Sequence, residues 1–220
     1  DLSGANLMGA SMLGANLRRA NLQDANLSDS DLTKANLSYA IMRGARVDGA
    51  TFVEANLIGV NISETDLVSS LGPSDDHTEF GKRPNFKGAK LNGLLLTDAN
   101  LDLIDLQGVK LEMVHFANIN MAEMKLAGAS FRDSNLYKVD LSNADLRGAD
   151  FRGAKLQNVD LSFADLTDVS FEYANLSNVK LTDADLTGSN LTGWRTENVW
   201  FCRTIMTDGR TNKEVLLNCQ

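Results

Sequence analysis

The chain is poor in the residues from which an ordinary globular core is built. Only 6% of its 220 residues are aromatic, although 43% are hydrophobic. Phe, Trp and Tyr usually supply much of the bulk of a core, so this core must be assembled from Leu and Ala in some regular way. Only two prolines interrupt the chain, which also favours a regular structure.

Acidic residues outnumber basic residues in the chain, and the sequence has no long apolar run. The chain has 29 Asp and Glu against 21 Lys and Arg, a formal net charge of −8 and a pI near 4.8. Direct nucleic-acid binders neutralise phosphates with clustered Lys and Arg, so this balance argues against direct binding to nucleic acid. No window approaches the ~18 consecutive apolar residues of a membrane-spanning helix, so we expect no membrane span in this chain.

A large aliphatic or aromatic residue, here called the central residue, recurs at every fifth position. One run extends from Leu2 to Leu67 and a second from Phe86 to Leu191. The second inward residue, often Ala, stands two positions before it, and most of the 17 glycines stand two positions after it. A period of five fits neither a helix nor a strand, so the chain must turn in every five residues, at a corner that favours glycine.

A longer period sets the number of sides. Similar residues recur twenty positions apart, as in the series Ile119, Val139, Val159, Val179 and Val199, the series Phe131, Phe151 and Phe171, and the series Ala144, Ala164 and Ala184. Residues twenty apart therefore share an environment. Four pentapeptides form one four-sided coil, and equivalent positions stack at a strand spacing of roughly 4.8 Å.

Runs such as GANLRRANLQDANL, ADLRGADFRGAKL and ANLSNVKLTDADLTG resemble the pentapeptide-repeat family, whose motif is A(N/D)LXX. The resemblance covers nearly the whole chain. It implies an all-β fold, a right-handed quadrilateral parallel β-helix whose central and second inward residues point inward. We accordingly expect coils over 1–67, a loop over 68–85, coils over 86–206 and a short C-terminal cap over 207–220.

The second inward residue becomes bulky in one stretch of the repeat. The residues concerned are Leu94, Ile104, Val109, Val114, Ile119 and Met124. We predict that these coils widen to hold the extra methylene groups at normal packing density. A cofactor cavity would need convergent polar groups, which this stretch lacks, so we expect no cofactor.

The repeat fails over residues 68–84, VSSLGPSDDHTEFGKRP, and returns out of phase by one residue. This polar segment contains both prolines and is interpreted as a projecting loop, either a partner-binding element or a disordered insertion. The candidate partner-binding residues are Asp75, Asp76, His77, Glu79 and Phe80. Adjacent acids in such a loop are mostly solvated charge, so we predict no metal site.

Enzyme signatures are missing from the chain. It contains no Walker loop, no GxGxxG after a strand, no GxSxG and no CxxC, and its two histidines, His77 and His115, lie far apart. With no acid, base and nucleophile set, we predict no catalytic residues and no enzymatic activity.

Outward-facing acids form columns along the predicted coils. Asp145, Asp165 and Asp185 are spaced by twenty, as are Asp140 and Asp160. Asp or Asn before the central residue is part of the family pattern, which is one explanation. The other is DNA mimicry, because the resemblance includes relatives that are similar to duplex DNA in shape and charge and bind type II topoisomerases. Basic residues interrupt the columns at Lys125 and Lys180.

Both ends of a stacked coil expose core and strand edges unless they are capped. After the last coil, an apolar lid is expected from Trp194, Trp200, Phe201 and residues 215–217. No cap precedes the first coil, so we expect a further segment, a partner or end-to-end self-association there. The segment FCRTIMTDGRTN resembles the closing segment of family members from cyanobacteria and plant chloroplast lumens.

The only two cysteines, Cys202 and Cys219, bracket this lid. Cys202 follows the inward residue Phe201, which should turn its sulfur outward, and an Asp208-Gly209 turn could return Cys219 to the same coil. We predict a disulfide between them, which would indicate an oxidising compartment; it favours a thylakoid lumen or periplasm, with the cytoplasm as the alternative location. The function we expect is a non-catalytic scaffold that presents rigid acidic faces and one loop to a protein partner. The alternative is a DNA mimic that binds a type II topoisomerase.

Overall fold

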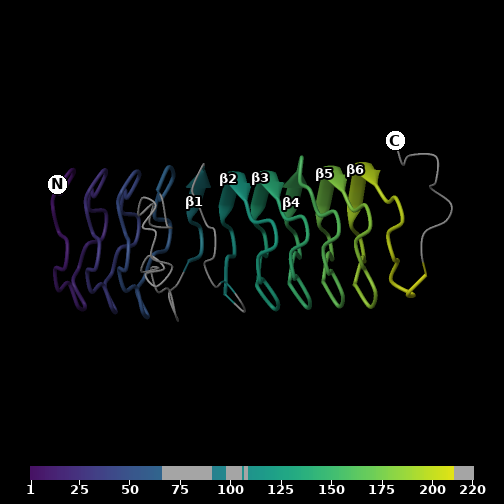
Figure 1. Cartoon of the computed structure of the whole chain (residues 1–220), viewed down its shortest axis with the longest axis horizontal. Helices are drawn as coiled ribbons and strands as arrows, with labels where there is room; N and C mark the ends of the chain where they lie inside the picture. The colour runs from purple at the N-terminus through teal and green to yellow at the C-terminus, as the bar shows by residue number, and fades with distance from the viewer. Residues whose placement is uncertain (66–90, 98–105, 107–108, 211–220) are drawn as a thin grey trace, which may run out of the picture. The chain divides into compact units, whose positions relative to one another are not determined.

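The computed structural model describes residues 1–65, 91–97, 106 and 109–210, which form parallel β-ladders (Figure 1). The chain divides into two compact units, Asp1–Ile104 and Asp105–Gln220. We call them the N-terminal unit and the C-terminal unit and describe each by itself. The residues within the described ranges include no helix, and the predicted all-β solenoid is confirmed.

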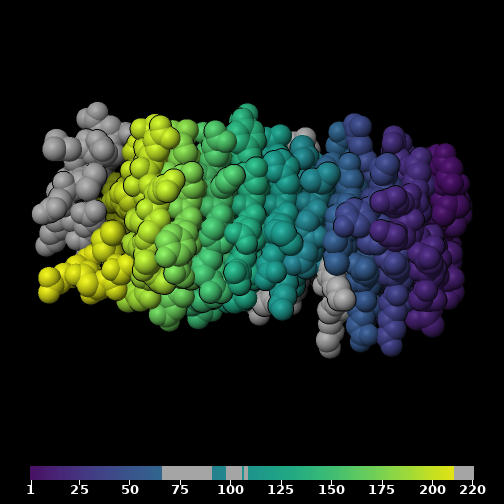
Figure 2. Space-filling model, turned by 180° about the vertical axis from the view of Figure 1, so that it is seen from behind, coloured from purple at the N-terminus to yellow at the C-terminus, as the bar shows by residue number. Residues whose placement is uncertain are grey.

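The C-terminal unit carries five strands joined in parallel. Their bounds are β2 (His115–Asn120), β3 (Asn135–Asp140), β4 (Lys155–Gln157), β5 (Asn175–Lys180) and β6 (Arg195–Trp200). Each strand pairs with the next at a spacing of twenty residues, so that Leu136 aligns with Leu156 and Leu156 with Leu176. In the space-filling view the successive coils of this unit appear as adjoining bands of atoms (Figure 2). The predicted twenty-residue coil is therefore confirmed.

The N-terminal unit is held mainly by single bridges between coils. Asn6 bridges to Asn26 and Asn26 to Arg46, again twenty residues apart, and the described residues of the unit include one strand, β1 (Leu95–Thr97). Asn61 bridges to Leu95, a longer separation than in the other isolated bridges. The ladder therefore continues in register on the far side of the segment where the repeat fails.

Each pentapeptide ends in a corner whose geometry recurs through both units. The backbone N–H of Ala5 donates to the carbonyl of Leu2 over 3.1 Å, and Ala144 donates to Leu141 over 3.2 Å. The corner residue, two positions after the central residue, has a positive φ, as at Gly148 (φ 66°). Glycine is not required there, because many corner residues carry side chains, among them Phe163 (φ 61°).

The core consists of columns of inward side chains. Leu141, Leu161, Leu181, Val139, Val159 and Val179 are all 1% exposed or less, as predicted. The rings of Phe131 and Phe151 stack with centroids 4.7 Å apart, and those of Phe151 and Phe171 with centroids 5.2 Å apart. Among the bulky inward residues, Leu94, Val114, Ile119 and Met124 are buried. Val109 is half-buried, and Ile104 lies outside the described residues.

The first coil is less well covered than the coils that follow it. Its central residues Leu2, Leu7, Met12 and Leu17 are half-buried, whereas Leu22 and Leu27 in the second coil are completely buried. Only one neighbouring coil packs against the first, so each of its inward side chains retains an exposed side.

Candidate interaction surface

The outward residue, immediately before each central residue, forms regular columns on the C-terminal unit. Asp140 bridges to Asp160 in one column, and Asp145 bridges to Asp165 and Asp165 to Asp185 in another. The predicted columns are therefore confirmed. Asp140 is exposed as predicted, but Asp160 is half-buried, so the prediction of its exposure is wrong.

The outward aspartates are held in place by their own backbone. The Asp140 carboxylate accepts the N–H of Ser142 over 2.9 Å, and the Asp185 carboxylate accepts the N–H of Thr187 over 2.8 Å. Asparagine makes the same bond in other coils, as at Asn190, whose Oδ1 accepts the N–H of Thr192 over 3.0 Å. The Asp or Asn in the motif therefore has a structural role in the turn, and the carboxylate adds a charge at a fixed place.

Basic side chains pair with several of these acids. Lys180 Nζ lies 2.8 Å from Asp160 Oδ2, which explains the partial burial of Asp160. Arg147 Nη2 lies 2.7 Å from Asp145 Oδ2, and Arg147 Nε lies 3.7 Å from Asp165 Oδ2 in the next coil. These cations reduce the negative charge of the columns but do not cancel it.

The ion pairs lower the pKa values of the carboxylates that they contact. The hydrogen bond from Arg147 holds the pKa of Asp145 below its usual range, and the Arg203 guanidinium does the same for Asp183. At Asp160, burial alone would raise the pKa, but the bonds from Lys180 and Ser162 outweigh burial and lower it. All three carboxylates are therefore charged at neutral pH.

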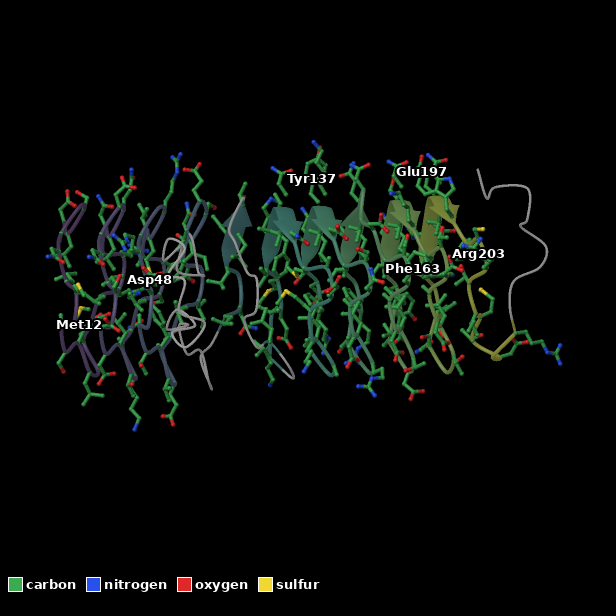
Figure 3. The ribbon with its side chains drawn as sticks, viewed as in Figure 1. Met12, Asp48, Tyr137, Phe163, Glu197 and Arg203 are labelled. Atoms are coloured by element: carbon green, nitrogen blue, oxygen red, sulfur yellow. The ribbon has the colours of Figure 1, made fainter. Side chains whose placement is uncertain are left out.

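An exposed aromatic residue stands between the acidic columns. Phe163 is 58% exposed and occupies the corner between the side of the coil that carries Asp160 and the side that carries Asp165. In Figure 3 it lies below Tyr137 and Glu197, which project from another part of the same unit. We call Phe163 and the six aspartates around it the Phe163 corner; these aspartates are Asp140, Asp145, Asp160, Asp165, Asp183 and Asp185.

Phe163 is not among the candidate site residues that the sequence indicates. Its only signal was an aromatic residue at a corner position, where the repeat mostly has Gly, Asn or Asp. The five predicted loop residues, Asp75, Asp76, His77, Glu79 and Phe80, lie outside the described residues, so their role stays a prediction.

The predicted disulfide also remains untested, because Cys219 lies outside the described residues. Cys202 is 5% exposed, so its expected outward position does not expose it to solvent. Within the described ranges, no three His, Cys, Asp or Glu side chains gather as a metal site would require. The same ranges contain no helix long and apolar enough to cross a membrane.

Family models match most of the chain. The model of pentapeptide repeats matches residues 1–38, 30–68 and 154–193, and a second model, of a pentapeptide repeat region, matches residues 104–173. No curated protein matches the chain.

Solved structures with the same fold extend this finding. HetL, a pentapeptide repeat protein involved in heterocyst differentiation regulation from the cyanobacterium Nostoc, is 26% identical, with a TM-score of 0.63 over 94% of this chain and 87% of that chain. A trypsin-treated variant of QnrB1, a plasmid-mediated fluoroquinolone resistance protein, is 16% identical, with a TM-score of 0.52 over 86% of this chain and 87% of that chain. At that identity the likeness to QnrB1 concerns the fold alone.

Proposed function

The chain belongs to the pentapeptide-repeat family, and we propose that it is a non-catalytic scaffold whose rigid acidic faces bind a protein partner. The observation that carries this proposal is the fixed placement of the outward carboxylates. Each is held by a backbone N–H and stacked on an equivalent residue of the next coil. Charges that need no ordering on binding make a surface of low entropic cost.

Two further features support a binding role. The acids exceed the cations that pair with them, so the C-terminal unit keeps a negative field that steers and selects a basic partner. HetL, to which the chain is similar over most of its length, is involved in regulation. The segment 68–85 is proposed as a second contact element, on the sequence argument given above.

Conversion of aspartate to asparagine tests the charged surface without disturbing the turns, because asparagine makes the same hydrogen bond to the backbone. The triple variant Asp140→Asn, Asp165→Asn, Asp185→Asn should lose the proteins that the wild type captures specifically from an extract of its source. The single variant Asp31→Asn, in the N-terminal unit, is the matched control and should capture them normally. Equal capture by the wild type and the triple variant would contradict the proposal.

A variant lacking residues 68–84 tests the contribution of the segment in the same capture experiment. Loss of a partner by this variant, with an unchanged far-UV circular dichroism spectrum, would assign recognition to that segment. Full retention would assign it to the coils.

The alternative function, a DNA mimic that binds a type II topoisomerase, is favoured by the regular spacing of the carboxylates. It is disfavoured by Arg147 and Lys180, which pair with acids of the columns, and by Arg203, which pairs with the corner residue Asp183, because duplex DNA has uninterrupted negative charge. A DNA supercoiling assay with purified gyrase separates the two. Inhibition or protection of gyrase at micromolar concentrations of the protein would support DNA mimicry. The absence of any effect would contradict it.

A further inference from the structure

Phe163 has a backbone conformation that its side chain does not favour. Its φ is 61°, in the left-handed region, where a bulky side chain is uncommon and where Gly, Asn and Asp are the usual residues. In its own column the residues of the adjacent coils are Asn143 and Asp183, both with positive φ. The neighbours in the column thus conform to the preference, and Phe163 departs from it.

Two other corner aromatics have a packing surface that Phe163 lacks, although their exposed fractions, 53% for Tyr39 and 68% for Tyr173, are similar to that of Phe163. The rings of Tyr39 and Tyr173 lie against the glycine of the next coil: a Cβ built on Gly59 would lie 2.7 Å from Tyr39 Cδ1, and one built on Gly193 would lie 2.6 Å from Tyr173 Cδ1. The residue one coil beyond Phe163 is Asp183, whose carboxylate is paired with Arg203. No glycine platform receives the Phe163 ring, and 58% of the residue stays exposed.

The charges around Phe163 limit which partners suit it. Asp165, two residues later in the chain, has a side chain that is 45% exposed, and its nearest cation, Arg147, is 3.7 Å away and closer to Asp145. Asp185 follows Asp165 in the same column and accepts hydrogen bonds from Thr187. An exposed ring beside incompletely neutralised carboxylates matches a partner group that is both flat and cationic.

Building on the proposed scaffold function, we propose that the Phe163 corner binds an arginine-rich segment of a partner protein. One guanidinium stacks on the Phe163 ring, and a neighbouring arginine pairs with Asp165 and Asp185. Arginine fits better than lysine because its planar guanidinium both stacks on a ring and donates two parallel hydrogen bonds to a carboxylate. Successive coils spaced at roughly 4.8 Å keep Asp165 and Asp185 within the reach of adjacent arginine side chains of one segment.

The test uses two fluorescein-labelled peptides of equal charge, one with alternating Arg and Ala and one with alternating Lys and Ala. Their binding to the full chain is followed by fluorescence anisotropy at low salt. The wild type should bind the arginine peptide more tightly. Phe163→Ala should weaken arginine-peptide binding by about fivefold and remove the preference over lysine, since a stacked cation contributes about 1 kcal/mol at an exposed site.

Matched variants separate the ring from the charges. Tyr173→Ala removes a corner aromatic that is also exposed, at 68%, but that lies on Gly193, and it should leave both peptides unaffected. The double variant Asp165→Asn, Asp185→Asn should weaken both peptides, because both carry the positive charge that the two carboxylates attract. Phe163→Asn suits the positive φ, so its midpoint of thermal unfolding should rise while the arginine preference is lost, which shows that the loss does not come from misfolding.

Several outcomes would overturn the inference: no binding of the arginine peptide, no preference for arginine, or equal losses in Phe163→Ala and Tyr173→Ala. The capture experiment distinguishes this failure from that of the scaffold function. If the triple asparagine variant loses the captured proteins and Phe163→Ala retains them, the scaffold stands and the arginine site does not.

Discussion

The N-terminal and C-terminal units use one pentapeptide template but fill their cores differently. In the second and third coils of the N-terminal unit, the residue at the second inward position of nearly every pentapeptide is a buried alanine, as at Ala25, Ala35 and Ala45. The C-terminal unit also has buried alanines at this position, such as Ala144 and Ala164, but it adds a column of stacked phenylalanines that includes Phe151 and a column of valines that includes Val159. The template therefore tolerates different core widths.

The difference teaches how volume is balanced along a coil. Phe151 is followed by the small inward residue Ala154, whereas Leu156 is followed by the larger Val159. A small inward residue thus follows the large ring of Phe151, whereas the larger Ile119 follows Phe116, so volume is balanced locally in each coil and not by one rule for the whole unit. Because a solenoid is stabilised by its individual coils and their neighbours, substitutions should act according to the column and the coil in which they fall.

The largest effect is expected from a cavity in an interior coil of the C-terminal unit. Leu161 is completely buried, so Leu161→Ala should lower the free energy of unfolding by about 2–5 kcal/mol. Leu17 lies in the half-covered first coil of the N-terminal unit, so Leu17→Ala should cost clearly less. Urea unfolding of both variants, followed by circular dichroism, measures the two losses. Equal losses would remove the distinction between end coils and interior coils.

Reduction of the predicted Cys202–Cys219 disulfide should affect the C-terminal unit alone, because the N-terminal unit has no cysteine. Restriction of the unfolded chain by a loop of this size contributes roughly 3 kcal/mol. A reductant should lower amide protection from hydrogen exchange in the last coils and leave residues 1–65 unchanged. Alkylation at both cysteines without prior reduction would remove the bond, and with it the proposal of an oxidising compartment such as a lumen or periplasm.

Two buried serines, one in each unit, should differ in their effect on the free energy of unfolding by about 1–3 kcal/mol. In the C-terminal unit, Ser134 Oγ donates to the Leu111 carbonyl over 2.6 Å and accepts the Val114 N–H over 3.1 Å. In the N-terminal unit, the Ser30 hydroxyl is buried without a hydrogen-bond partner. Ser134→Ala should destabilise because it leaves buried backbone groups unpaired, whereas Ser30→Ala should be neutral or stabilising. Thermal unfolding of both variants checks the opposite signs.

The fold could be predicted from the sequence because its periods of five and twenty residues leave few alternatives. Leu161 and Val159 point inward because they occupy the two inward positions of the repeat, as does every residue in their columns. The exposure of the Phe163 ring could not be predicted in this way, because the repeat assigns a corner position and a residue twenty positions later but does not fix how much of the ring is covered; Tyr173, which lies on Gly193, is also exposed. Likewise, the partial burial of Asp160 depends on the reach of Lys180 from the next coil, a contact between long side chains that the repeat leaves open.

Substitution of the corner aromatics Phe163 and Tyr39 should change the free energy of unfolding by different amounts, because the two rings pack differently. Phe163→Asn should raise the free energy of unfolding by about 0.5–1 kcal/mol, because asparagine tolerates positive φ and little buried surface is lost. Tyr39→Asn, in the N-terminal unit, should gain less or lose stability, because it removes the ring that lies on Gly59. Chemical denaturation of both variants measures the difference. A loss of stability in Phe163→Asn would mean that the ring has a packing role.

The smallest expected effect is the response to acid and salt, and it also differs between the units. Arg147 and Arg203 lower the pKa values of Asp145 and Asp183 in the C-terminal unit, whereas in the N-terminal unit the Thr33 side chain and backbone lower that of Asp31. A carboxyl whose pKa is lower in the folded state stabilises the fold above its unfolded pKa, and the contribution is lost as pH falls through the folded value. Stability should therefore decline below about pH 4.

Added salt should affect the two units differently. Because the arginine pairs are exposed, salt should reduce the acid sensitivity of the C-terminal unit and leave the contribution of Asp31 largely unchanged. Hydrogen exchange of each unit between pH 2 and pH 5, at low and high salt, measures this; identical salt dependence in the two units would show that the ion pairs contribute nothing.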